Sequence, residues 1–312
     1  DYFSTDSYAR SWHHDEFCFS MVYAFAENYI LSLSHDEVVH GKHSLIDKMP
    51  GDVWRKFASV RTLMLYQMSH PGAKLNFMGA EFGQFIEWRF YEQLEWFLLD
   101  YESHRLLQNF NSELNKFYIE HSQLWGEDHS WDGFEWIDAS DVKNNVFIYK
   151  RSDPKSEEND IYVALNMVPQ PLECYKIPVY EEGKYKIVFN TDDMSHGGSG
   201  YPTGAGDDGL FDSVAEEFNG KPYHLVMNLP PLAGIYFMLV KVPEEQKNIS
   251  ALNDSEASKI VPEVQKKDMV KTVSSAEHTK ASHKKKGHSG VTKPSVNSSV
   301  SGEKTDNNNK NK

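Results

Sequence analysis

Residues 29–43 read YILSLSHDEVVHGKH, and the stretch changes character halfway along. Leu31 and Leu33 alternate with serines, which is the pattern of a short, half-buried β-strand. Ionisable side chains follow at once, beginning with His35, Asp36 and Glu37. Such a strand end is typical of folds that carry out chemistry at the ends of their strands.

The elements that follow predict an α/β fold. Asp52 has the residue type of an N-cap, and one helical face then collects Val53, Phe57, Val60 and Met64. A Pro-Gly pair ends this helix before a second short strand at residues 73–78, and a further helix covers residues 106–117. The order strand, helix, strand, helix predicts parallel βαβ units.

The second predicted strand also ends in polar residues, Glu81 and Gln84. Because the carboxyl ends of parallel strands meet at one edge of a sheet, we expect these residues to face the same region as His35 and Asp36. The alternative interpretation is that all of them are ordinary loop residues.

Residues 133–240 show a different pattern. Their β-rich runs, at 146–149, 161–165, 185–189 and 235–239, are separated by turns that contain Asn, Asp, Pro and Gly. The pattern predicts an antiparallel, sandwich-like β domain. We therefore expect three parts, at residues 1–125, 126–242 and 243–312.

Composition narrows the class of protein. The chain has 312 residues, enough for two domains, with 32 basic and 46 acidic side chains and a net charge of −14. This balance disfavours nucleic acid and anionic membranes as partners, and no run reaches the ~20 apolar residues of a membrane span. Two cysteines fit a reducing compartment. Residues 243–312 lack aromatic side chains, which predicts a disordered tail.

Several motifs point to other chemistry and are rejected. The histidines of HDEVVH at residues 35–40 are five apart and follow a strand, unlike a zinc-binding HExxH helix. The GAGDDG run at 204–209 neither follows a clear strand nor opens a helix, and its two aspartates would repel a phosphate. The serines at 32 and 34 lack a nucleophile elbow. We therefore expect no metal and no cofactor.

Aromatic residues concentrate after the second strand, at Trp88, Phe90, Tyr91, Trp96 and Phe97. Sugar rings present flat C–H faces that stack on aromatic rings, while carboxylates bind their hydroxyl groups. An acidic surface with exposed aromatics suits a neutral polyhydroxyl ligand, although most of these rings are expected in the core.

An ordered set of motifs carries a family resemblance. NYILSLSHDEVVHGK at 28–42, MPGD at 49–52 and FMGAEFGQ at 77–84 are followed by EW at 87–88, LEW at 94–96, GFEW at 133–136, NTD at 190–192 and LPPLA at 229–233. Over about residues 1–240 the sequence resembles bacterial-type 1,4-α-glucan (glycogen) branching enzymes of the α-amylase superfamily.

The resemblance implies the C-terminal part of a (β/α)₈ barrel, followed by a β domain. Residues 29–34 and 74–78 would be the seventh and eighth barrel strands, and residues 106–117 the last barrel helix. Such enzymes cleave an α-1,4-glucan and transfer the segment to a 6-hydroxyl, so that glucan chains are donor and acceptor. The resemblance also implies a cytoplasmic enzyme that is monomeric when complete.

The resemblance assigns roles at the first strand end. His35 would bind the sugar in subsite −1, and Asp36 would be the carboxylate that stabilises the oxocarbenium-like transition state of a retaining double displacement. Glu37, Lys42, Glu81 and Trp88 would line the groove for the donor or acceptor chain.

The family's nucleophile and general acid belong to strands four and five, which would precede Asp1. We therefore expect this chain alone to be inactive and poorly folded, because two βα units leave unpaired strand edges. Two alternatives stay open: an α-amylase-like glucan hydrolase, and a non-catalytic carbohydrate-binding fragment.

Overall fold

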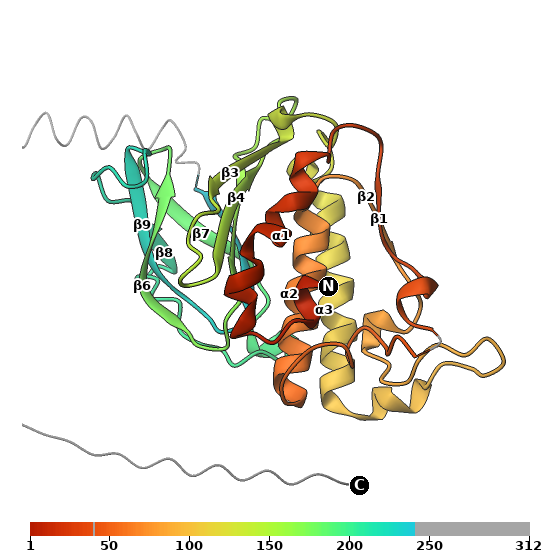
Figure 1. Ribbon diagram of the computed structural model, residues 1–312. Helices are drawn as coiled ribbons and strands as arrows, with labels where there is room; N and C mark the ends of the chain where they lie inside the picture. The colour runs from red at the N-terminus through yellow and green to blue at the C-terminus, as the bar shows by residue number, and fades with distance from the viewer. Residues whose placement is uncertain (40, 241–312) are drawn as a thin grey trace, which may run out of the picture. The chain divides into compact units, whose positions relative to one another are not determined.

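The computed structural model describes residues 1–39 and 41–240 (Figure 1). His40 and the predicted tail at residues 243–312 lie outside the described residues. The first part of the chain contains the helices α1 (His14–Phe19), α2 (Val53–Ser69) and α3 (Glu102–Glu120) and the strands β1 (Ile30–Leu33) and β2 (Ala73–Asn76). No helix in the described part combines the length and apolar character that a membrane crossing requires.

The helix predicted after Asp52 is confirmed as α2. The Asp52 carboxylate accepts a hydrogen bond from the Arg55 N–H at 2.9 Å, which satisfies one of the free donors of the first turn. Phe57, Val60 and Met64 are buried as predicted, whereas Val53 in the first turn is exposed.

The predicted parallel pairing of the two short strands is confirmed. β1 and β2 run parallel, with Leu33 beside Asn76 at their carboxyl ends. The Gln67 amide of α2 donates to the Leu31 carbonyl at 2.8 Å and to the Leu75 carbonyl at 3.2 Å, so that one side chain fastens the helix to both strands. The two strand ends therefore share one edge.

The second part is an all-β domain, as its turn-separated pattern predicts. A six-stranded antiparallel sheet has the order β3-β4-β5-β10-β7-β8, and β6 and β9 form a separate antiparallel pair. The strands are β3 (Phe134–Asp138), β4 (Val146–Arg151), β5 (Ile161–Asn166), β6 (Leu172–Val179), β7 (Lys184–Asn190), β8 (Leu210–Asp212), β9 (Tyr223–Leu229) and β10 (Ala233–Leu239). The sequence pattern indicates four of these eight.

The six-stranded sheet is covered on both faces. Tyr236 of β10 belongs to a hydrophobic cluster with Phe57 of α2 and Phe110 of α3, whereas the adjacent Phe237 packs with Ile177 of β6 and Leu225 of β9. Neighbouring residues of a strand point to opposite faces. The helices therefore cover one face of the sheet and the β6–β9 pair covers the other.

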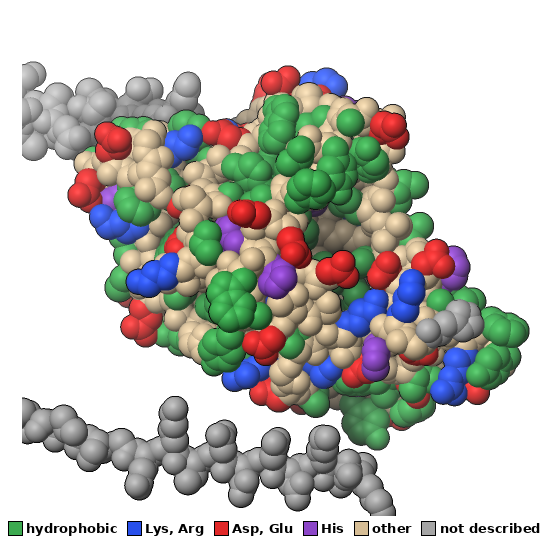
Figure 2. Space-filling view, viewed as in Figure 1, with side chains coloured by type: hydrophobic (Ala, Val, Ile, Leu, Met, Phe, Trp, Pro, Cys, Tyr) green, Lys and Arg blue, Asp and Glu red, His purple; other side chains and the backbone are tan. Residues whose placement is uncertain are grey.

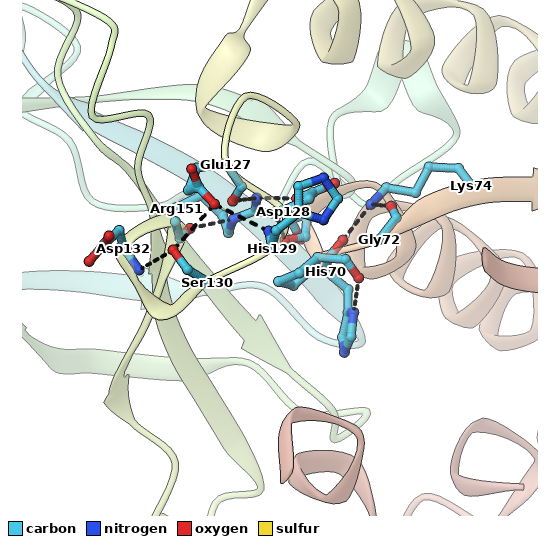
Figure 3. Close-up of polar contacts among 12 residues, drawn as sticks. His70, Gly72, Lys74, Glu127, Asp128, His129, Ser130, Asp132 and Arg151 are labelled. Carbon is cyan, nitrogen blue, oxygen red and sulfur yellow. Dashed lines mark hydrogen bonds and ion pairs between the residues drawn. The ribbon is translucent and has the colours of Figure 1, made fainter. Parts of the chain in front are cut away.

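A buried polar cluster joins the helical part to the β domain (Figure 3). The Arg151 guanidinium donates to the Ser69 carbonyl at 2.6 Å, to the Gly133 carbonyl at 2.7 Å and to the Asp128 carboxylate at 2.6 Å. The Lys74 ammonium, at the start of β2, donates to the carbonyls of His70 and Gly72. Burial lowers the pKa of Lys74 to about 7 and that of His70 to about 4.

Candidate active site

The candidate site lies at the shared carboxyl edge of β1 and β2. A single 3₁₀ turn, η4 (His35–Glu37), follows β1, and the Phe77 N–H after β2 donates to the Leu33 carbonyl at 2.9 Å. Ser34 caps η4, since its hydroxyl accepts the Asp36 N–H at 3.2 Å. The backbone that carries His35 and Asp36 is therefore fixed by local hydrogen bonds.

His35 and Asp36 lie side by side and open to solvent. The His35 Nε2 atom is 3.3 Å from the Asp36 Oδ1 atom, and the two side chains are 53% and 73% exposed. Because an exposed carboxylate keeps free lone pairs, it can accept hydrogen bonds from a ligand or face a positive charge without first breaking a buried contact. The pair is therefore accessible to a substrate.

Aromatic rings border this pair on one side. The Trp88 ring lies 6.2 Å from the His35 ring and 5.0 Å from the Phe77 ring, and both contacts are edge-to-face. The Trp88 backbone N–H donates to the Val38 carbonyl at 2.9 Å, which fixes the backbone of Trp88 against the loop after β1. The predicted site residues Trp88, His35 and Asp36 are therefore brought together.

A hollow of about 890 Å³ lies beside η4, with Glu37, Lys42 and Lys48 among its lining residues. The face drawn in Figure 2 is hollowed near its centre, with acidic side chains along the rim. The Lys48 ammonium lies 3.1 Å from the Glu37 carboxylate, so Glu37 is held in an ion pair. Lys42 is exposed at this hollow.

Glu81 has a local structural contact. It lies in η5 (Ala80–Phe82), and its carboxylate accepts the Gly79 N–H at 2.7 Å. Gly79 has a φ of +92°, which favours glycine, so the Glu81 carboxylate stabilises a left-handed turn. Within the described residues, no hydrogen bond or ion pair joins Glu81 to His35 or Asp36.

One positioning residue is clear only in the structure. The Glu87 carboxylate accepts the N–H groups of Gly41 and His43 at 3.0 and 2.8 Å, which ties the loop after η4 to the segment that carries Trp88. His43 in turn contacts Asp47 at 2.8 Å, and this hydrogen bond lowers the Asp47 pKa. Glu87 belongs to the EW motif, but its partners are more than forty residues away in the sequence.

Within residues 1–39 and 41–240, no group of three or more His, Cys, Asp or Glu side chains is arranged to hold a metal ion. What the arrangement offers is a carboxylate, an imidazole and an indole at one strand edge, which together can bind a polyhydroxyl ligand by hydrogen bonds and stacking.

Comparison with protein families identifies the β domain. Residues 136–240 match the model described as "Alpha amylase, C-terminal all-beta domain". This match shows that the β domain is of the kind found at the C-terminus of enzymes of the α-amylase superfamily.

Comparison with curated proteins narrows this class. The chain is 46% identical over 237 residues to a 1,4-alpha-glucan branching enzyme of Halothermothrix orenii, which covers 76% of this chain and 37% of that enzyme. It is 44% identical to a branching enzyme of Clostridium perfringens, over 79% of this chain and 36% of that enzyme, and 44% identical to one of Synechococcus elongatus, over 78% and 31%. The chain belongs to the family of 1,4-alpha-glucan branching enzymes, and it spans about a third of the length of these relatives.

Proposed function

We propose that this chain is part of an enzyme that cleaves an α-1,4-glucan and transfers the released segment to a 6-hydroxyl, forming an α-1,6 branch. The relatives named as branching enzymes support the reaction. The observation that carries the proposal is the exposed His35–Asp36 pair at the carboxyl end of β1, with the Trp88 ring beside it.

In this proposal Asp36 is the carboxylate that stabilises the transition state. Positive charge builds on the anomeric carbon as the glycosidic bond breaks, and a fixed anion lowers the energy of that state. The Ser34 hydroxyl holds the Asp36 backbone, and the His35 imidazole lies 3.3 Å from its carboxylate. His35 would donate to, or accept from, a hydroxyl of the same sugar unit in subsite −1.

The remaining predicted residues would border the groove for the glucan chain. Trp88 offers a ring for stacking, and Lys42 lies at the rim of the hollow beside η4. Glu37 would bind sugar only in exchange for Lys48, and Glu81 only in exchange for the Gly79 amide. We therefore rank Trp88 and Lys42 above Glu37 and Glu81 as contacts to substrate.

The proposed architecture assigns β1 and β2 to neighbouring strands of a (β/α)₈ barrel. The barrel part comprises residues 1–125, the β domain residues 126–242, and a tail residues 243–312. The nucleophile and the general acid would come from residues that this chain does not include. The reaction passes through carboxylates alone and needs no cofactor. Glucan chains would be both donor and acceptor, in a cytoplasmic, monomeric enzyme.

The test uses amylose and the complete gene product that contains this chain. Branching lowers the iodine colour while reducing ends stay nearly constant, and debranching of the product releases the new side chains. A rise in reducing ends in step with the loss of colour would instead identify a hydrolase. Amylose binding without either change would identify a carbohydrate-binding protein and reject the proposal.

A further inference from the structure

A pair of exposed aromatic side chains lies in the loop between η5 and η6 (Trp96–Asp100). Phe90 is 79% and Tyr91 67% exposed, and their ring centroids lie 5.2 Å apart in an edge-to-face arrangement. This loop extends away from the helices in Figure 1, and hydrophobic side chains gather at the corresponding edge in Figure 2. Exposure of two large rings forgoes the free energy that burial would supply.

The turn that carries these rings is closed by two contacts. The Glu92 N–H donates to the Arg89 carbonyl at 3.2 Å, and the Arg89 guanidinium lies 3.1 Å from the Glu92 carboxylate. Phe90 and Tyr91 occupy the two central positions of this turn. The ion pair also cancels the charge of Arg89, so that the tip presents rings between two neutralised groups.

The loop is fastened to the candidate active site at its base. The Trp88 N–H donates to the Val38 carbonyl at 2.9 Å, and the Gln84 side-chain oxygen accepts the Glu95 N–H at 3.0 Å. Since Tyr91 is three positions after Trp88, their Cα atoms lie at most about 11 Å apart. The exposed rings therefore continue the aromatic border that begins at His35.

We propose that Phe90 and Tyr91 form a stacking platform for a stretch of α-glucan chain that runs past Trp88 out of the candidate active site. The proposal rests on the proposed function, because it takes the glucan as the ligand. The flat C–H faces of sugar rings fit exposed aromatic faces, and a tip without net charge favours a neutral chain over a phosphorylated ligand. The competing interpretation is that another segment of protein covers the rings of Phe90 and Tyr91.

The experiment compares two double variants of the complete gene product, F90A/Y91A and F90L/Y91L. Leucine keeps apolar volume and removes the ring, so that stacking on sugar is lost in both variants. We expect the KM for amylose to rise about five- to tenfold in both, since two ring contacts disappear. The kcat and the thermal midpoint should not change. Tyr101→Ala, which removes an exposed tyrosine outside this turn, is the matched control and should leave KM unchanged.

Two results would overturn the platform. One is an unchanged KM for amylose in F90A/Y91A. The other is a lowered thermal midpoint in F90A/Y91A that F90L/Y91L restores, which would mean that protein side chains cover the pair. Failure of the proposed function is distinguishable, because the parent protein would then form no α-1,6 linkages. In that case retardation of parent and variants in an amylose-containing native gel still tests the platform directly.

Discussion

The charged groups at the two ends of strand β2 differ in their exposure to solvent. Beyond its carboxyl end lie His35 and Asp36, two exposed groups whose ionic contact is 3.3 Å long. At its amino end Lys74 is half-buried, beside the wholly buried Arg151 and its partner Asp128. Both ends contain an anion and a cationic or basic group, but only the first leaves them accessible.

Because of this difference, we expect charges at the exposed end to affect ligand binding and charges at the buried end to affect stability. Removing a charge from the exposed end should leave the fold intact and change what the site can bind, because water already solvates the neighbours. Removing a charge from the buried end leaves a carboxylate and several carbonyls without a partner, which costs stability. The predictions below test this division, beginning with the largest expected effect.

Arg151→Met should produce the largest loss of stability. The guanidinium binds the Ser69 and Gly133 carbonyls and the Asp128 carboxylate, and methionine satisfies none of them. Breaking a buried ion pair costs about 3–5 kcal/mol. The thermal midpoint should fall by about 10 °C or more. A change of only 1–2 °C would show that the junction between the helical part and the β domain does not depend on this cation.

Asp36→Asn should produce the largest loss of activity. The amide keeps the size of the side chain and removes its negative charge, so that the transition state loses an electrostatic contact worth about 10²–10³ in rate. The measurement is the rate of formation of α-1,6 linkages by the complete gene product, with the thermal midpoint as a check on the fold. Asp212→Asn is the matched control, because Asp212 at 75% is as exposed as Asp36 at 73% and lies in the β domain. Undiminished transfer by Asp36→Asn would reject the assigned role.

The exposed end was more predictable from the sequence than the buried end. The alternation around Leu31 and Leu33, and the polar run that begins at His35, are local signals that survive in a single sequence. The Asp52 cap and the buried face of α2 are local as well. The contact of Trp88 with His35 joins residues more than fifty positions apart, and only the family resemblance suggested that they share a site.

The buried end had no such signal. Arg151 ends a strand and Asp128 lies in a loop, and nothing in either segment indicates the other. The strands β3, β6, β8 and β9 were also missed. In β6, mixed burial, a bulge and a left-handed Cys174 obscure the alternation. The substrate contact of Glu81 stays a prediction, and nothing in the sequence indicated that its carboxylate would also accept the Gly79 N–H.

Lys74→Met should remove a pH dependence at the buried end. The pKa of this ammonium is lowered from 10.5 to about 7, chiefly by burial, with a raising contribution from Asp128 and a further lowering one from Arg151 included in that value. Between pH 7 and 10.5 the unfolded chain therefore binds more protons at this group than the native protein, so its contribution to the free energy of unfolding rises with pH. If half of this change in pKa is realised, it contributes about 2 kcal/mol to the free energy of unfolding.

The measurement is the thermal midpoint of parent and variant at pH 7 and at pH 9. We expect the stability of Lys74→Met relative to the parent to be higher at pH 7 than at pH 9, because the ammonium of the parent lowers its stability most where it is still partly charged. Lys186→Met, at an exposed position of β7, is the control and should show no such dependence. An equal difference between variant and parent at both pH values would mean that Lys74 does not titrate in this window.

Glu87→Gln should weaken substrate binding without unfolding the protein. The carboxylate accepts two N–H groups from the loop after η4, and an amide in its place turns one of those acceptors into a donor. Hydrogen bonds to a charged acceptor are worth about 1.5–3 kcal/mol, part of which the loop recovers from water. The KM for amylose should rise about three- to tenfold. A loss confined to kcat would instead place Glu87 among the reacting groups.

Lys176→Met should have the smallest effect and completes the comparison with Arg151→Met. Lys176 lies 3.1 Å from Glu216, and its side chain is 42% exposed, whereas that of Arg151 is 0% exposed. Both are ion pairs between a strand residue and a loop carboxylate, so burial and the extra carbonyl contacts are what distinguish them. An exposed pair contributes about 0–1 kcal/mol, and the thermal midpoint should move by no more than about 3 °C. If the two variants lowered the midpoint equally, the stabilising role of Arg151 would have to come from its charge alone, and the division between an accessible end and a buried end of β2 would no longer explain stability.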